Sequence, residues 1–192
     1  MAHVQDFLKD CERICAALDH EKVEALAEKL RALRDRRGRL FILGVGGGAA
    51  NASHAANDFR KLCGIEAYAP SDNIAELTAR ANDEGWDTIF SGWLRVSRIN
   101  GADALLILSV GGGRLGVSDH IIRAIECAKV KRARVFGIVG MEDGHAAIHG
   151  DLVIVVPRLN EALLTPLAEA FQAVILHALA SHPKLQINST KW

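Results

Sequence analysis

The side chains best suited to proton transfer belong to two pairs of residues, each with one histidine and one carboxylate. His54 and Asp58 are four residues apart in a stretch of small residues that predicts a helix over about 49–63, so they share one helix face. Glu169 and His177 are eight apart in a second predicted helix, which places them on the same broad side at different heights. Imidazole and carboxylate groups exchange protons near neutral pH. The alternative for His54 is a packed histidine without a chemical role.

A glycine-rich turn directly precedes the first pair. The apolar run 40–43 predicts a strand, and Gly44, Gly46, Gly47 and Gly48 follow it before the helix begins. Glycines let backbone N–H groups approach an anion closely, and the N-terminus of the helix behind them adds partial positive charge. The turn is neither a complete GxGxxG motif nor a Walker A motif. A phosphate site and a plain tight turn therefore both fit this stretch on its own.

A second glycine-rich turn favours the phosphate site. The apolar run 104–109 predicts a central parallel strand, and it leads into three glycines at 111–113 and Arg114. Five strands are expected near residues 40, 66, 106, 137 and 154, alternating with helices. The common order for such a parallel sheet is 2-1-3-4-5, as in flavodoxin-like folds, and its switch point lies between the first and third strands. Both turns follow those two strands, so we expect one anion site in one crevice.

The remaining segments complete a single α/β domain over residues 1–192. Residues 1–37 carry two amphipathic stretches and are expected to form a helical hairpin, which would pack against another subunit or cover one face of the sheet. His145 and His149 are also four apart, but only one further candidate ligand lies near them. We interpret these two histidines as surface residues rather than as a metal site.

The composition fits a globular domain. The chain has 192 residues, of which 49% are hydrophobic, and 23 Lys plus Arg balance 23 Asp plus Glu. This balance argues against a general nucleic-acid or membrane surface. The charged N-terminus lacks the apolar core of a signal peptide, and no apolar run reaches the roughly 18 residues of a membrane span. The four cysteines form no CxxC pair, so we expect the reducing cytoplasm.

With these features in place, the chain resembles the sugar isomerase (SIS) domain proteins, and more closely the phosphoheptose isomerases. Together with the N-terminal helices, the matching segments span nearly the whole chain; they are GVGGGAANASHAANDF at 44–59, SDNIAELTARANDEGWDTIF at 71–90, SVGGG at 109–113 and TPLAEAFQAVILHAL at 165–179. The resemblance implies an isomerase that interconverts sedoheptulose 7-phosphate and D-glycero-D-manno-heptose 7-phosphate in heptose biosynthesis. It also implies a cytoplasmic homotetramer with active sites at subunit interfaces.

The resemblance further assigns roles to residues. Asp58 or Glu169 is implied as the base, and His177 as the acid, of an enediol reaction that moves a proton next to a carbonyl. Some family members bind zinc through nitrogen and oxygen ligands at positions that correspond to His54, Asp58, Glu169 and His177. Four such ligands would occupy both the acid and the base, so the zinc could be structural, inhibitory or a Lewis acid. The implied substrate-binding and phosphate-binding residues are Gly46, Gly47, Gly48, Asn51, Asp72, Ser109, Gly111, Gly112, Gly113 and Arg114.

The chain also departs from the family pattern. The first loop of relatives usually reads Gly-Asn-Gly-Gly-Ser, and here Val45 replaces the Asn and Gly48 the Ser. Relatives commonly carry Glu at the position of Asp58 and Gln at that of Glu169. The second loop has lost hydroxyl groups and offers backbone N–H donors instead. Three functions stay open: this isomerase, an isomerase of another sugar phosphate, and a non-catalytic sugar-phosphate-binding or scaffold tetramer.

Overall fold

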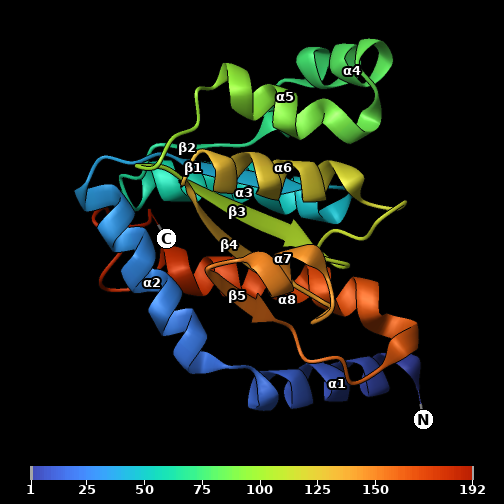
Figure 1. Ribbon diagram of the computed structural model, residues 1–192. Helices are drawn as coiled ribbons and strands as arrows, with labels where there is room; N and C mark the ends of the chain where they lie inside the picture. Colours follow the sequence, from blue (N-terminus) through green and yellow to red (C-terminus); the bar gives the residue numbers. More distant parts are fainter. Residues whose placement is uncertain (1, 192) are drawn as a thin grey trace.

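Five short apolar runs form a sheet at the centre of the molecule (Figure 1). The computed structural model describes residues 2–191. All neighbouring strands pair in parallel in the order β2-β1-β3-β4-β5, so the predicted α/β class, strand number and strand order are confirmed. The strands are β1 Leu40–Gly44, β2 Ala67–Tyr68, β3 Ala104–Ser109, β4 Arg134–Val139 and β5 Leu152–Val155.

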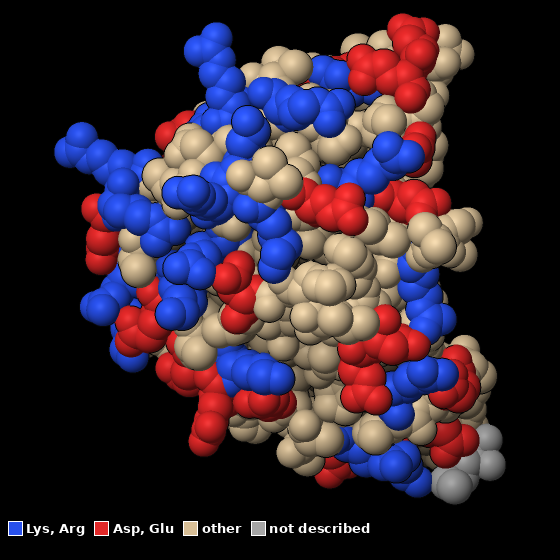
Figure 2. All heavy atoms as spheres, viewed as in Figure 1, with Lys and Arg blue, Asp and Glu red and all other residues tan. Residues whose placement is uncertain are grey.

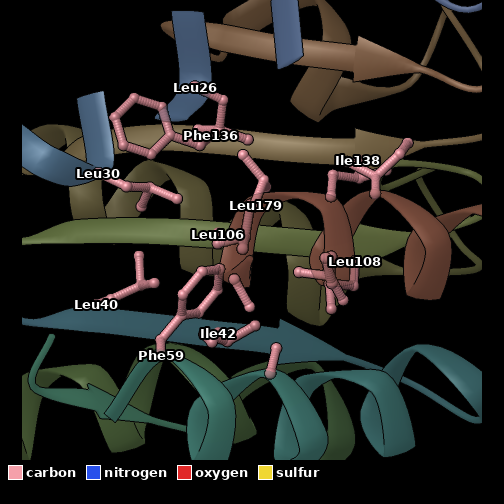
Figure 3. Close-up of a cluster of buried hydrophobic side chains, with 14 of the residues drawn as sticks. Leu26, Leu30, Leu40, Ile42, Phe59, Leu106, Leu108, Phe136, Ile138 and Leu179 are labelled. Atoms are coloured by element: carbon pink, nitrogen blue, oxygen red, sulfur yellow. The ribbon is translucent and has the colours of Figure 1, made fainter. Parts of the chain in front are cut away.

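Helices cover both faces of this sheet, because the strand side chains alternate between two cores. In the first core, shown in Figure 3, Leu30, Phe59 and Leu179 from three helices surround Leu106 and its neighbours. The second core lies on the opposite face, where α5, α6 and α7 pack. Among the described residues the α-helices are α1 His3–Ala17, α2 His20–Asp35, α3 Gly47–Lys61, α4 Ile74–Asp83, α5 Ile89–Val96, α6 Asp119–Val130, α7 His145–His149 and α8 Leu164–Ala180.

The last helix, α8, is a core helix beside α3. Residues 161–180 are long and apolar enough to cross a membrane by length and composition. However, Leu167, Phe171 and Leu179 are buried in the first core, and a core helix of a globular domain has the same composition. The packing of α8 along α3 therefore brings two helices together that are separated by about a hundred residues of sequence.

The two N-terminal helices follow one another around the edge of the molecule, and Figure 1 shows them running in different directions. Leu26 and Leu30 of α2 are fully buried against the sheet. The first helix, α1, is anchored by buried Ile14 and by the side chain of Asn160, which donates to Asp10 at 2.9 Å. Their use in oligomer packing remains a prediction.

Positive charge gathers away from the carboxyl ends of the strands. Figure 2 shows Lys and Arg side chains crowded on the left, where the strands begin in Figure 1. Arg39 at that end pairs with the buried carboxylate of Asp103 at 2.7 Å.

Candidate active site

Three of the predicted catalytic and metal-binding residues come together between α3 and α8. The Nε2 atom of His54 lies 3.2 Å from Asp58 Oδ2, and the Nδ1 atom of His177 lies 3.7 Å from the same oxygen. The two imidazole rings meet edge to face with 5.0 Å between their centroids. Asn57 donates its side-chain amide to the other oxygen, Oδ1, at 3.0 Å. We refer to His54, Asp58 and His177 as the histidine–aspartate cluster.

The donor atoms of this cluster fit a metal ion of the zinc type. One ligand atom from each residue lies within 4.8 Å of the others. Two imidazole nitrogens and a carboxylate oxygen are the ligands of many catalytic zinc sites, which leave a fourth position open for water or substrate. The side chains of His54 and His177 are 55% and 61% exposed, so the cluster opens to the surface of this chain.

Glu169, the fourth predicted ligand, lies apart from the cluster. Its carboxylate lies against the first residue of α3, since a Cβ atom at Gly47 would come within 2.3 Å of Glu169 Oε2. A carboxylate at this place faces the partial positive charge of the helix N-terminus. The structure therefore puts the acid of α8 at the glycine turn and the histidine of α8 at Asp58, two turns further along.

A polar bridge joins the two helices between these points. Asn51 donates to the backbone carbonyl of Glu169 at 3.0 Å and to the side-chain oxygen of Gln172 at 3.2 Å. Gln172 is fully buried and donates in turn to the carbonyl of Ile138 at 3.2 Å. Gln172 was not predicted from the sequence, where its only signal was an amide on the apolar face of α8. Asn51, predicted to contact substrate, thus also fixes α8 against α3.

The glycines of the first turn allow close packing at the start of α3. Gly46 has a φ of 59°, a conformation that side chains rarely adopt. A Cβ atom at Gly48 would lie 2.5 Å from the carbonyl oxygen of Leu108, so α3 begins in direct contact with β3. Packing alone therefore explains glycine at position 48, and phosphate binding by Gly46, Gly47 and Gly48 remains a prediction.

The second turn borders a cavity at the predicted switch point. The backbone N–H of Gly112 donates to Ser109 Oγ at 3.0 Å, and Gly112 and Gly113 have φ values of 67° and 91°. Arg114 pairs with Asp143. A cavity of about 350 Å³ lies here, which we call the switch-point cavity; its lining includes Val45, Trp86, Ser109, Gly111, Ser118 and His120. Residues from the loops after β1 and β3 thus meet in one crevice, as the strand order predicts.

Asp72 is also held against α3. Ser53 donates to Asp72 Oδ1 at 2.5 Å, and its hydroxyl lies 2.9 Å from that of Ser71. This contact fixes Asp72 beside α3 at Ser53, one residue before His54 in the sequence.

His120, His145 and His149 lie outside the histidine–aspartate cluster. Within the described residues, the metal-type cluster does not include His145 or His149, whose rings lie 4.2 Å apart on α7. His120, by contrast, was not singled out by the sequence, although it is only 3% exposed and lines the switch-point cavity. Because no carboxylate lies four residues from His120 in the sequence, the spacing that pointed to His54 and Asp58 did not point to His120.

Comparison with known proteins gives both sequence relatives and shared folds. No family model matches the chain. Lincomycin biosynthesis protein LmbN of Streptomyces lincolnensis is 29% identical over 188 residues, and the match covers 92% of this chain but slightly less than two thirds, 66%, of that relative. A phosphoheptose isomerase of Rhodospirillum rubrum is 31% identical over 170 residues, with 86% of this chain and 84% of the relative covered. A phosphoheptose isomerase of Chlorobaculum tepidum is 30% identical, with 77% and 71% covered.

Solved structures share the fold over nearly the full length. The phosphoheptose isomerase of Neisseria gonorrhoeae superposes with a TM-score of 0.80 at 24% identity, covering 92% of this chain and 95% of that one. The enzyme of Francisella tularensis gives a TM-score of 0.76 at 20% identity, covering 94% and 97%. At these identities the structures establish the shared fold, whereas the family rests on the sequence relatives.

Proposed function

Because the chain belongs to the phosphoheptose isomerase family of SIS-domain sugar isomerases, we propose that it interconverts sedoheptulose 7-phosphate and D-glycero-D-manno-heptose 7-phosphate. The observation that carries this proposal is the histidine–aspartate cluster, in which one carboxylate oxygen faces two imidazole nitrogens at 3.2 and 3.7 Å. An aldose–ketose isomerase needs a base and an acid on either side of a carbonyl and its neighbouring carbon.

The proposed proton transfers use residues of α3 and α8. Asp58 removes the proton from the carbon next to the carbonyl, and His177 donates a proton to the carbonyl oxygen, which gives an enediol. Return of a proton to the other carbon, with loss of a proton from the second oxygen, completes the exchange of aldose and ketose. Asn57 holds Asp58 Oδ1 at 3.0 Å and leaves Oδ2 directed at the imidazoles.

The same three residues, His54, Asp58 and His177, would hold a zinc ion. Such an ion supplies Lewis-acid polarisation of the carbonyl when it is bound. If Asp58 is a ligand, Glu169 is the remaining candidate base, and its carboxylate must leave its position at Gly47 to reach the reacting carbons.

The length of α3 suits an extended sugar phosphate. His54 is seven residues beyond Gly47, a rise of roughly 10 Å along the helix axis. A phosphate held at the glycine turns, by the residues from Gly46 to Gly48 and from Ser109 to Arg114, would therefore leave the carbonyl end of a long sugar chain near Asp58. Asp72, held against α3 by Ser53, is proposed to bind a hydroxyl.

A homotetramer would complete the site. The two histidines of the cluster are more than half exposed in one chain, which supports a second subunit that covers them and excludes water from the reacting carbons. Residues 1–37 offer part of an interface, since Val4 and Leu8 on α1 are 65% and 61% exposed. We place the active sites between subunits for this reason.

The decisive experiment measures turnover of sedoheptulose 7-phosphate by the purified protein, with and without prior chelation, together with metal analysis. Conversion that survives chelation supports acid–base catalysis by Asp58, Glu169 and His177 alone. Conversion that is lost and returns with Zn²⁺ makes the cluster a catalytic metal site. No conversion by a folded oligomer under either condition contradicts the proposal.

A second candidate is an isomerase of another sugar phosphate. Val45 lines the switch-point cavity, where the family pattern has an amide side chain, so the contacts to the sugar differ. A panel of pentose, hexose and heptose phosphates separates the two candidates. Binding of a sugar phosphate without conversion of any would instead indicate a non-catalytic binding or scaffold protein.

A further inference from the structure

His120 is a buried histidine whose ring nitrogens have no protein partner. The residue is 3% exposed, and among the described residues no group forms a hydrogen bond with its Nδ1 or Nε2 atom. Leaving buried polar atoms unpaired is unfavourable, and a phenylalanine would fill the same space without that cost. An unpaired histidine at such a position suggests a partner that is not part of the protein.

The surroundings of His120 keep its ring neutral and fixed. The rings of Trp86 and Phe90 meet it edge to face at 5.5 and 5.4 Å between centroids. Burial lowers the pKa of His120 below 6.5, although the neighbouring carboxylate of Asp119 acts in the opposite direction. That carboxylate is itself engaged by the backbone N–H of Gly116 at 3.1 Å. At neutral pH the ring therefore offers one N–H donor and one nitrogen acceptor.

His120 lies in the first turn of α6, directly behind the second glycine turn, and its side chain lines the switch-point cavity together with Trp86 and Ser118. We propose that His120 is a specificity-determining residue that forms hydrogen bonds with a hydroxyl group on the carbon chain of a sugar phosphate bound in this cavity. The proposal rests on the proposed function for the class of ligand, and it assigns a role to a residue outside the histidine–aspartate cluster.

A hydroxyl group matches this ring better than a phosphate does. A hydroxyl both donates and accepts, so it can satisfy a donor or an acceptor nitrogen, whereas a phosphate dianion only accepts. The donors suited to a phosphate lie elsewhere on the cavity wall, at the backbone of Gly111 and at Arg114. A site that buries a polar group for a substrate hydroxyl also discriminates strongly against analogues that lack it.

Trp86 controls access to the ring. Its side chain lines the cavity, covers His120, and is still 47% exposed, so it can move without unpacking the core. It follows Gly85, whose φ of 89° marks a glycine-dependent turn at the start of the segment. Ligand binding that moves Trp86 should therefore change its fluorescence, which provides a readout independent of catalysis.

The test measures the binding of two probes to the full chain. One is glucitol 6-phosphate, which is a polyol phosphate with no carbonyl, and the other is inorganic phosphate. His120→Phe keeps an aromatic ring between Trp86 and Phe90 but removes both nitrogens. We expect it to weaken binding of glucitol 6-phosphate roughly tenfold, to leave binding of inorganic phosphate within about twofold, and to melt at the same or a higher temperature. His120→Gln, which retains a donor and an acceptor, should recover part of the affinity.

His149→Phe is the matched control, because the same substitution on α7 lies outside the cavity lining; it should change neither affinity. The proposal would be overturned if His120→Phe weakened the binding of both probes equally or weakened neither. It would also be overturned if the variant melted at a lower temperature and lost binding in parallel, or if the wild-type protein bound neither probe. A wild-type protein that binds the polyol phosphate through His120 but isomerises no sugar phosphate would overturn only the proposed function.

Discussion

Glu169 lies with its carboxylate directly against Gly47, at the first residue of α3. A Cβ atom at position 47 would come within 2.3 Å of the Glu169 Oε2 oxygen. The carboxylate of Glu169 therefore lies away from the histidine–aspartate cluster, although Glu169 and His177 belong to the same helix. The carboxylates of Asp58 and Glu169 therefore lie at separate points along α3.

Gly47→Ala should displace Glu169 without disturbing the fold. Position 47 has an ordinary helical backbone, so alanine is tolerated there, but its methyl group overlaps the Glu169 carboxylate. We expect turnover to fall up to about a hundredfold, because small displacements of catalytic groups have large effects on rate. Steady-state kinetics and thermal unfolding check this expectation. Ala50→Ser, an exposed change on the same helix, is the control, and wild-type turnover by Gly47→Ala would show that Glu169 needs no fixed place.

Zinc affinity should depend on three residues of the predicted four. His54→Ala and His177→Ala each remove a donor atom of the cluster and should weaken Zn²⁺ binding by at least about a hundredfold. Glu169→Gln should leave the affinity nearly unchanged, since that carboxylate lies at Gly47 instead. Competition with a chelating dye measures all three, with His145→Ala as a control histidine outside the cluster. If Glu169→Gln lost as much Zn²⁺ affinity as the histidine variants, Glu169 would be a zinc ligand as well.

The sequence predicted the fold well because the strands are short apolar runs bounded by glycine, and parallel sheets have few common orders. The prediction that His54 and Asp58 share a face depended only on helix periodicity and is confirmed by their 3.2 Å contact. The meeting of Asp58 with His177 depends on how α3 and α8 pack, which no local pattern encodes. Glu169 and His177 are about 12 Å apart along their helix axis, and this spacing does not fix the directions of their long side chains, which decide whether the two can share one metal ion.

Restoring the family serine at position 48 should damage the protein rather than improve it. A Cβ atom there would lie 2.5 Å from the backbone carbonyl of Leu108, which cannot move without shifting β3. We expect Gly48→Ser to lower the free energy of unfolding by about 1–3 kcal/mol, the usual effect of overpacking. Val45→Asn, at the other departure from the family, should fold normally because Val45 is 44% exposed. Urea unfolding of both variants measures this, and a fully stable Gly48→Ser would refute the packing explanation.

The cysteines should differ sharply in reactivity. Cys15 is exposed, whereas Cys63 is fully buried, and burial raises the pKa of the Cys63 thiol to about 11. Because the thiolate is the reactive form, a thiol reagent at pH 8 should modify Cys15 quickly and Cys63 only after unfolding in urea. Mass spectrometry of peptides identifies each site, and Cys15→Ser should abolish the labelling at that position. Rapid labelling of Cys63 in the folded protein would mean that the core opens readily around Cys63, where α3 and α8 both end.

The pH dependence of stability should identify His120 as a neutral buried group. Its pKa in the folded protein lies below the ordinary value of 6.5, so below that pH the unfolded chain binds a proton that the folded chain excludes. Wild-type stability should therefore decrease as the pH falls from about 6.5 towards the lower folded pKa, and His120→Phe should lack this contribution. The pKa of His145 is also lowered by burial, but that residue is present in both proteins and cancels in the difference. Urea unfolding at several pH values should show the variant gaining stability over wild type as the solution becomes more acidic. A difference that stays constant, or that shrinks on acidification, would mean that the imidazole of His120 accepts a proton in the folded state.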